Sequence, residues 1–166
     1  MKLPPLLSDG LAVVFVGTEP GRESLRRGQY YADPTNCFYR HLAEAGFTPR
    51  QLRPGEFRDL PGYGIGLDDV YDDADELHAR LESARPRAVC FNSYEALRRF
   101  AGQDRLPRPW RRDAAGRYAR FGEASAWATS DSSWNASKYW PQRLDDLRAL
   151  LERLGASRPG SGTGTG

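Results

Sequence analysis

The fold is decided by the stretch Val13–Tyr39, which reads VVFVGTEPGRESLRRGQYYADPTNCFY. The apolar run from Leu11 to Val16 predicts a buried strand, which breaks into the turn formed by residues 17–21 (GTEPG). Its proline fixes one backbone angle and its two glycines permit positive φ, so the backbone there can approach a ligand closely. Glu19 is therefore expected at the carboxyl end of the first strand, where open α/β sheets bind their ligands.

The second half of this stretch adds an aromatic face and an amide to that carboxylate. Tyr30 and Tyr31 come ten residues after the turn, and residues 33–36 read DPTN. A carboxylate, an aromatic ring and a side-chain amide together indicate a site for a flat ring with hydrogen-bonding edges.

Further along the chain, predicted strands and helices alternate. The strands are expected at about 12–16, 62–67, 87–92 and 124–129, with a shorter one at 118–121; the helices are expected at 36–45, 54–60, 75–84, 94–101 and 141–154. Gly46 is expected to end the first helix, and Ser93 to cap the helix that follows it. The alternation predicts a single three-layer α/β/α domain over residues 1–156 with a mostly parallel central sheet. Residues 157–166 (SRPGSGTGTG) are expected to form a disordered tail.

Composition is that of a globular protein with an uneven distribution of charge. The 166 residues are 39% apolar, with no run long enough to cross a membrane and no signal-peptide pattern, which makes the cytoplasm the expected location. The two cysteines are expected to be free buried thiols. Residues 1–83 carry 9 Lys and Arg against 14 Asp and Glu, whereas residues 84–166 carry 15 against 8. The basic second half indicates either a polyanionic partner or solvated arginines.

Taken alone, the GTEPG turn is a weak motif. Glycine-rich turns after a first strand also hold phosphates, but this one lacks both G-x-G-x-x-G and the Gly-Lys-Ser/Thr of a P-loop. A dinucleotide or nucleoside triphosphate site is thereby disfavoured. A structural turn that carries a solvated glutamate remains the alternative.

The wider pattern resembles the mismatch-specific uracil-DNA glycosylase and thymine-DNA glycosylase family of the uracil-DNA glycosylase superfamily. That family has Gly-Ile-Asn-Pro-Gly after its first strand, then an aromatic residue with Ala-His-Pro-Ala-Asn-Arg-Phe-Trp, and then Ala-Gly-Phe. Without a gap, the corresponding segments here are 17–21 (GTEPG), 31–39 (YADPTNCFY) and 45–48 (AGFT). Residues 64–69 (GIGLDD) and 91–94 (FNSY) resemble the family's Gly-Ile-Gly-Leu-Thr-Asp and Phe-Asn-Gly-Lys. The resemblance spans roughly residues 8–154 and is strongest over the first 70.

The resemblance implies a glycosylase that extrudes a deaminated base, uracil first, and hydrolyses its N-glycosidic bond. Tyr31 would stack on that base, while Asn36 and the backbone around Gly17 and Thr18 would read its edge. The alternatives are a half-buried loop aromatic for Tyr31 and a helix N-cap for Asn36. Where the family has asparagine this chain has Glu19, a carboxylate that can stabilise an oxocarbenium-like sugar and activate water. We therefore predict that Glu19 is the main catalytic residue.

A second superfamily motif lies in a loop after the last strand, which here is the segment 129–135 (TSDSSWN) without the usual proline. An ungapped register puts Ala128 at the motif's variable His/Asn/Met position, and a gapped register puts Asp131 there. The loop is expected to contact DNA through Ser130, Asp131, Ser132 and Ser133. Trp134 is the candidate wedge that fills the vacated stack, or else a ring that anchors the loop to the final helix. Arg111 and Arg112, within an arginine-rich stretch, are expected to contact phosphates.

No metal or organic cofactor is expected. The acidic run Asp68, Asp69, Asp72, Asp73, Asp75 and Glu76 lacks calcium-loop spacing and is interpreted as the solvated start of a helix, and the two histidines are far apart. The turn has no lysine, which disfavours a Schiff-base lyase step. The prediction is a monomeric, monofunctional uracil-DNA glycosylase acting on uracil-containing DNA, including G:U mismatches. A damaged-DNA-binding protein of the same fold with little turnover, or a nucleoside-processing enzyme, remains the alternative.

Overall fold

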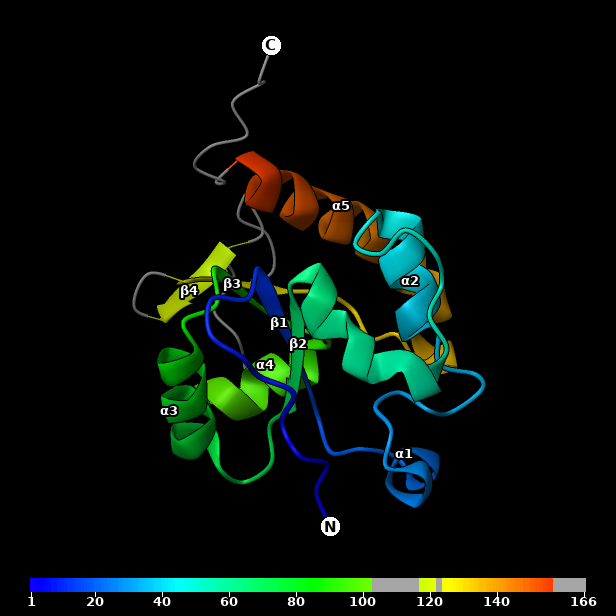
Figure 1. Cartoon of the computed structure of the whole chain (residues 1–166), viewed down its shortest axis with the longest axis horizontal. Helices are drawn as coiled ribbons and strands as arrows, with labels where there is room; N and C mark the ends of the chain where they lie inside the picture. The colour runs from blue at the N-terminus through cyan, green and yellow to red at the C-terminus, as the bar shows by residue number, and fades with distance from the viewer. Residues whose placement is uncertain (103–116, 122–123, 157–166) are drawn as a thin grey trace.

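The structure is a computed structural model that describes residues 1–102, 117–121 and 124–156. Its centre is a five-stranded sheet with the strand order β2-β1-β3-β5-β4. The strands are β1 (Val13–Gly17), β2 (Ile65–Asp69), β3 (Ala88–Phe91), β4 (Arg117–Phe121) and β5 (Ala124–Ala128). The first four in the sheet are parallel, and β4 pairs antiparallel with β5 at one edge (Figure 1).

Helices cover both faces of this sheet, which confirms the predicted three-layer α/β/α architecture. On one face lie α2 (Phe38–Ala45), α5 (Trp140–Ala156) and the 3-10 helix η1 (Pro54–Tyr63), packed on alternate strand residues such as Phe15 and Cys90. On the other face α3 (Ala74–Ala84) and α4 (Tyr94–Ala101) pack on the intervening residues. The period-two alternation of strand side chains thus divides the apolar residues into two cores.

The sequence located most of these elements within a few residues. Gly46 ends α2 with a φ of 96°, and the Ser93 hydroxyl caps α4 by accepting a hydrogen bond from the Ala96 backbone N–H. The prediction missed the short helix α1 (Arg22–Arg27) and the 3-10 helix η3 (Trp134–Tyr139). Both lack apolar periodicity, so the sequence pattern carried no signal for them.

The parallel register places four residues side by side at the carboxyl edge of the sheet. Asp69 at the end of β2 pairs with Gly17 at the end of β1. The Asn92 backbone N–H donates to the Val16 carbonyl, and the Thr129 N–H to the Phe91 carbonyl. Asp69, Gly17, Asn92 and Thr129 therefore form a row that continues the core face covered by α2 and α5.

Candidate active site

A pocket of about 400 Å³ opens over this row of residues. It is lined by residues from six separate segments of the chain: Leu3; Gly17, Thr18, Glu19, Pro20, Gly21 and Ser24; Tyr30, Tyr31, Asp33, Thr35 and Asn36; Asp69; Asn92 and Ser93; and Asp131, Ser133, Trp134 and Asn135. The structure thus brings the predicted GTEPG turn, the tyrosine–asparagine segment and the second-motif loop into one site.

Gly17 leaves space in the row where the other three residues carry side chains. A Cβ atom there would lie 2.8 Å from Asp69 Oδ1 and 2.9 Å from the Tyr31 hydroxyl, closer than Cβ atoms are found. Neither Gly17 nor Gly21 is among the residues with positive φ. The predicted reason for these glycines was therefore wrong for both: at Gly17 the requirement is close approach of two polar side chains, not an unusual turn.

Tyr31 is held rigidly in the wall of the pocket. Its ring stacks on Phe38 of α2, with ring centroids 4.0 Å apart and planes inclined by 22°. Its backbone has a φ of 53°, which a side chain of this size adopts only when its surroundings demand it. The Tyr31 hydroxyl is buried and has no hydrogen-bond partner among the described residues. Burial, followed by the charge of Asp69, raises the pKa of Tyr31 well above its usual value.

Glu19 lies at the mouth of the pocket with its side chain 61% exposed. Its Oε1 atom is 3.2 Å from Nη1 of Arg99, which extends from α4 on the opposite side of the sheet. The side chain is therefore solvated, and it lines the mouth of the pocket while it contacts Arg99.

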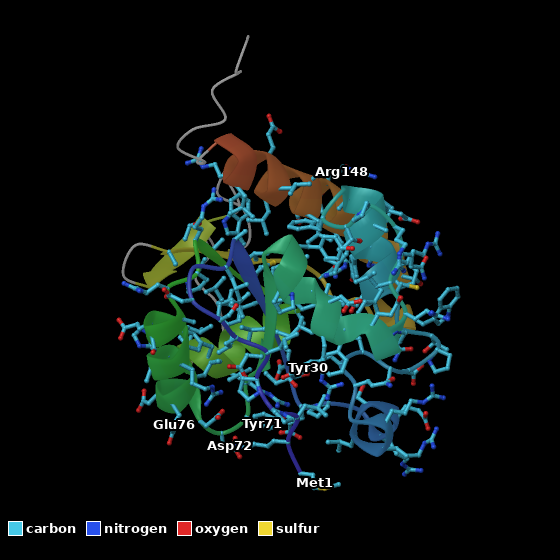
Figure 2. All side chains as sticks on the ribbon, viewed as in Figure 1. Met1, Tyr30, Tyr71, Asp72, Glu76 and Arg148 are labelled. Carbon is cyan, nitrogen blue, oxygen red and sulfur yellow. The ribbon has the colours of Figure 1, made fainter. Side chains whose placement is uncertain are left out.

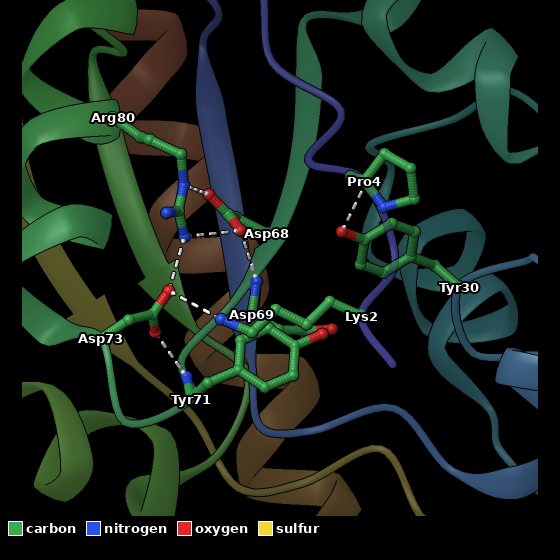
Figure 3. A network of polar contacts seen from close by, with 8 residues as sticks. All are labelled: Lys2, Pro4, Tyr30, Asp68, Asp69, Tyr71, Asp73 and Arg80. Atoms are coloured by element: carbon green, nitrogen blue, oxygen red, sulfur yellow. Dashed lines mark hydrogen bonds and ion pairs between the residues drawn. The ribbon is translucent and has the colours of Figure 1, made fainter.

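Asp69 is a second carboxyl group in the pocket, and it is only 3% exposed. Burial, then the charge of Asp68, raises its pKa to about 8, so the group is mostly protonated at neutral pH. Asp68 itself is tied to Arg80 of α3, with Oδ2 2.9 Å from Nε, and Arg80 also reaches Asp73 (Figure 3). Arg80 therefore pairs with Asp68 and not with Asp69, which faces the pocket.

The acidic run after β2 is thus not one solvated segment. Asp72, Asp75 and Glu76 are exposed, as predicted, and Figure 2 shows Asp72 and Glu76 at the outer edge of α3. The interpretation was wrong for Asp68 and Asp69, which belong to β2 and are buried. The end of this fully buried strand was hidden because a pair of adjacent acids interrupts the apolar run.

Asn36 lies one residue before the N-cap of α2, which is Cys37, so the N-cap alternative was wrong, and its role toward a base stays a prediction. Its Oδ1 atom accepts a hydrogen bond of 3.0 Å from the Phe38 backbone N–H at the start of α2, so the amide helps to begin the helix. It also lines the pocket, and among the described residues no acceptor binds its Nδ2 group. This amide is oriented by the helix start and retains donors for a ligand.

The second-motif loop forms the wall opposite Glu19. Asp131 lines the pocket and accepts a hydrogen bond of 2.7 Å from the Ser133 N–H, whereas Ala128 is buried in the far core. The gapped register therefore fits the geometry. Trp134 is 62% exposed at the rim, and its ring makes an edge contact with Trp140 at 5.7 Å.

Ser132 does not face solvent. It is fully buried, its hydroxyl accepts a 3.0 Å hydrogen bond from Asn92 Nδ2, and its carbonyl accepts from the Cys37 N–H. Its predicted contact to a DNA phosphate does not fit this placement, since the side chain braces the loop internally. The Ser130 hydroxyl lies 3.5 Å from the Tyr139 carbonyl, a weak contact that leaves it available at the surface. Arg111 and Arg112 lie outside the described residues.

Sequence reasoning missed Asp69 and Asn92 as pocket residues, and it also missed the buried Arg143, which does not line the pocket. Asp69 and Asn92 each directly end or follow a parallel strand, and that position was the available signal. Arg143 had none, because it occurs on an amphipathic helix among other charged residues. No group of three or more potential metal ligands occurs in the parts of the chain that the structure describes, and no helix there is long and apolar enough to cross a membrane.

Comparison with known proteins agrees with the fold. The sequence model of the uracil DNA glycosylase superfamily matches residues 4–155. A solved NMR structure from Methanosarcina acetivorans, whose own assignment as a uracil DNA glycosylase is provisional, superimposes with a TM-score of 0.58 at 19% identity. That match covers 92% of this chain and 96% of the other.

The chain therefore belongs to the uracil DNA glycosylase superfamily, whose members are hydrolases of N-glycosyl bonds in DNA. The match establishes this class of protein and its partner, DNA.

Proposed function

We propose that this protein excises a deaminated base, uracil first, from DNA as a monofunctional, monomeric glycosylase that also accepts G:U mismatches. The observation that carries the proposal is the convergence in one pocket of Glu19, Tyr31 and Asn36 with the buried carboxyl group of Asp69. Glu19 provides a carboxyl group that can activate water, and Tyr31 provides a flat aromatic surface. Asn36 and Asp69 provide hydrogen-bonding groups for the edge of a base.

The pocket suits a base that carries a carbonyl next to a ring N–H. A protonated carboxyl group donates one hydrogen bond and accepts another, and Asp69 is mostly protonated at neutral pH. Uracil and hypoxanthine both present such a carbonyl and N–H pair, whereas cytosine does not. Asn36 adds amide donors, and Tyr31, backed by Phe38, supplies a rigid face.

The proposed reaction breaks the C1′–N bond, with both bonding electrons leaving on the base nitrogen. Glu19 stabilises the cationic sugar and accepts a proton from the water that attacks C1′. The departing base anion takes up a proton, so the products are the free base and an abasic site. Trp134 fills the vacated stack as a wedge, while Ser130, Ser133 and Arg111 and Arg112 engage the DNA backbone.

The test is cleavage of labelled oligonucleotides that carry one uracil, opposite G, opposite A or unpaired, followed by alkali. Wild-type protein is expected to yield alkali-labile sites. Glu19→Gln keeps the size of the side chain but removes the carboxylate that accepts a proton from water. This variant is expected to reduce the rate of uracil excision by about 10²- to 10⁴-fold. A Glu19→Gln variant that excises uracil at the wild-type rate contradicts the assignment of Glu19. A full set of negative wild-type reactions, with hypoxanthine substrates included, contradicts the proposed activity.

One observation favours a damaged-DNA-binding protein with little turnover as the second candidate. Glu19 is exposed and paired outward with Arg99, rather than fixed against the pocket. Tight, salt-dependent binding to uracil-containing duplexes without excision would support this alternative.

A further inference from the structure

A fully buried guanidinium lies beneath the second-motif loop. Arg143, on α5, is 0% exposed. Its Nε donates to His41 Nδ1 at 2.9 Å, and its Nη1 donates to Thr129 Oγ1 at 2.7 Å and to the Ser130 carbonyl at 2.6 Å. Its Nη2 has no hydrogen-bond partner among the described residues. Burial of a charge is costly, so its retention here calls for a physical reason.

The three groups that accept from Arg143 are all neutral. Threonine and a backbone carbonyl carry no charge, and His41 is uncharged because burial and the adjacent Arg143 lower its pKa to about 4. The guanidinium stays protonated, since arginine keeps its proton in proteins. The carboxylates that act on it at longer range are Asp131 and Asp146. The hydrogen bonds therefore hold the cation in place without cancelling its charge.

The cation lies close to the base pocket. Thr129, which binds Nη1, neighbours Asn92 in the row at the carboxyl edge, and Asn92 lines the pocket. Adjacent strands are about 4.8 Å apart, so the guanidinium is roughly 8 Å from this wall. Arg143 is also the group that most strongly opposes the rise in the pKa of Tyr31, a pocket residue. The positive potential thus extends into the space where a base would lie.

We propose that Arg143 provides a buried positive potential that stabilises the anion of the departing base, without touching it. This inference rests on the proposed glycosylase function. When the C1′–N bond breaks, its electron pair moves to the base nitrogen, and negative charge develops over the pocket floor. The Asp69 carboxyl, being mostly protonated at neutral pH, adds little opposing charge.

A base that contacts this wall lies about 3 Å beyond it, at about 11 Å from the charge. At an effective dielectric constant of about 20, a charge at that distance changes the rate of an anion-forming step by roughly 10-fold. Arg143→Met keeps the length of the side chain and removes the charge. Arg143→Lys keeps the charge on the same helix. Both variants are first compared with wild type by circular dichroism and thermal unfolding.

The decisive readout is sensitivity to the leaving group. Single-turnover excision is measured on matched oligonucleotides with uracil or with 5-fluorouracil, whose electron-withdrawing fluorine makes it a better leaving anion. We expect Arg143→Met to slow uracil excision by roughly 10-fold and 5-fluorouracil excision by clearly less. Arg143→Lys is expected to restore most of the wild-type ratio between the two substrates. Equal losses on both substrates in Arg143→Met indicate a purely structural role and overturn the proposal.

A measurement on wild-type protein covers the case in which Arg143→Met does not fold. Inhibition by the free base 6-azauracil, a more acidic analogue of uracil, is measured as the pH is raised through its ionisation. Tighter inhibition by the ionised analogue supports the proposal, and weaker inhibition overturns it. Wild-type protein without activity on any base would instead contradict the proposed function itself.

Discussion

The ends of two neighbouring strands, β1 and β2, each present a carboxyl group to the same pocket, and their environments are opposite. Glu19, just beyond β1, is 61% exposed and pairs with Arg99 at the surface. Asp69, the last residue of β2, is 3% exposed and has its pKa raised to about 8. One acid is a mobile charge at the mouth of the site, and the other is a fixed, mostly neutral group on its floor.

The difference teaches that environment, more than residue type, assigns the chemistry of a carboxyl group. An exposed carboxylate can attract a proton from water and stabilise a cation, whereas a buried protonated acid is suited to hydrogen bonding with a neutral base. Gly17 ends the strand beside Asp69, and its missing side chain lets Asp69 and Tyr31 both approach the backbone at this position. The division of roles therefore depends on a residue with no side chain of its own.

Gly17→Ala is the change expected to have the largest effect on this arrangement. The new Cβ would lie under 3.0 Å from Asp69 Oδ1 and from the Tyr31 hydroxyl, so both must move. A shift of about 1 Å in groups that position a substrate reduces the rate on the order of 100-fold. The measurement is single-turnover excision of uracil from a duplex oligonucleotide.

Gly21→Ala is the matched control for that substitution. It lies in the same turn, and nothing is within 4 Å of the position of its added Cβ. The control is expected to keep the wild-type rate within a few-fold. Similar losses in both variants would mean that the turn, and not the approach of Asp69 and Tyr31 to Gly17, is sensitive.

Asp69→Asn tests whether burial has made this acid neutral. Because its folded pKa of about 8 exceeds the unfolded value of about 3.9, the folded state binds the extra proton, and stability falls as the pH rises between those values. His41 is neutral in the fold, with its pKa lowered from 6.5 to about 4. Between those values its contribution to the stability of the fold rises with pH, which opposes the effect of Asp69. The uncompensated fall is therefore expected between pH 6.5 and 8, at up to about 1.4 kcal/mol per pH unit.

Urea unfolding at a series of pH values measures this effect. Wild-type protein should lose about 2 kcal/mol between pH 6.5 and 8, and Asp69→Asn should lose much less, while it still excises uracil. Asp68→Asn is the control in the same strand: it removes the partner of Arg80 and should destabilise the protein across the whole range. An unchanged slope in Asp69→Asn would show that Asp69 is ionised in the fold.

The centre of the sheet could be predicted because β1 and β3 are short apolar runs bounded by glycine, proline or polar residues. The turn with Glu19 and the segment from Tyr31 to Asn36 could also be placed near one edge, since both follow the first strand. The burial of Asp69 could not be predicted, because two adjacent acids look solvated in sequence. It depends on Arg80 neutralising only one of them, and that contact is formed between β2 and α3.

Arg143 illustrates the same limit at longer range. Its partners His41 and Thr129 are 102 and 14 residues away, and they meet only because α2 and α5 pack side by side on one face of the sheet. Ser132 was expected at the surface because serine in a polar loop is usually solvated, yet it is buried by its contact with Asn92. Long-range packing decides which polar residues turn inward, and local sequence does not record it.

Arg99→Ala is expected to have the smallest effect, and it tests the exposed carboxyl group of the pair, Glu19. An exposed ion pair contributes about 0.2–1 kcal/mol, so loss of the Arg99 contact should change the free energy of unfolding by less than about 1 kcal/mol. Excision should change only a few-fold, because Glu19 must leave this partner to reach the sugar. Arg98→Ala is the matched control, since Arg98 also pairs with Glu95 on α4 but not with Glu19. Arg99→Ala would contradict this expectation if it lost nearly as much excision as Glu19→Gln while Arg98→Ala did not. Arg99 would then hold Glu19 in the position from which it acts, and the carboxyl groups of both Glu19 and Asp69 would be fixed.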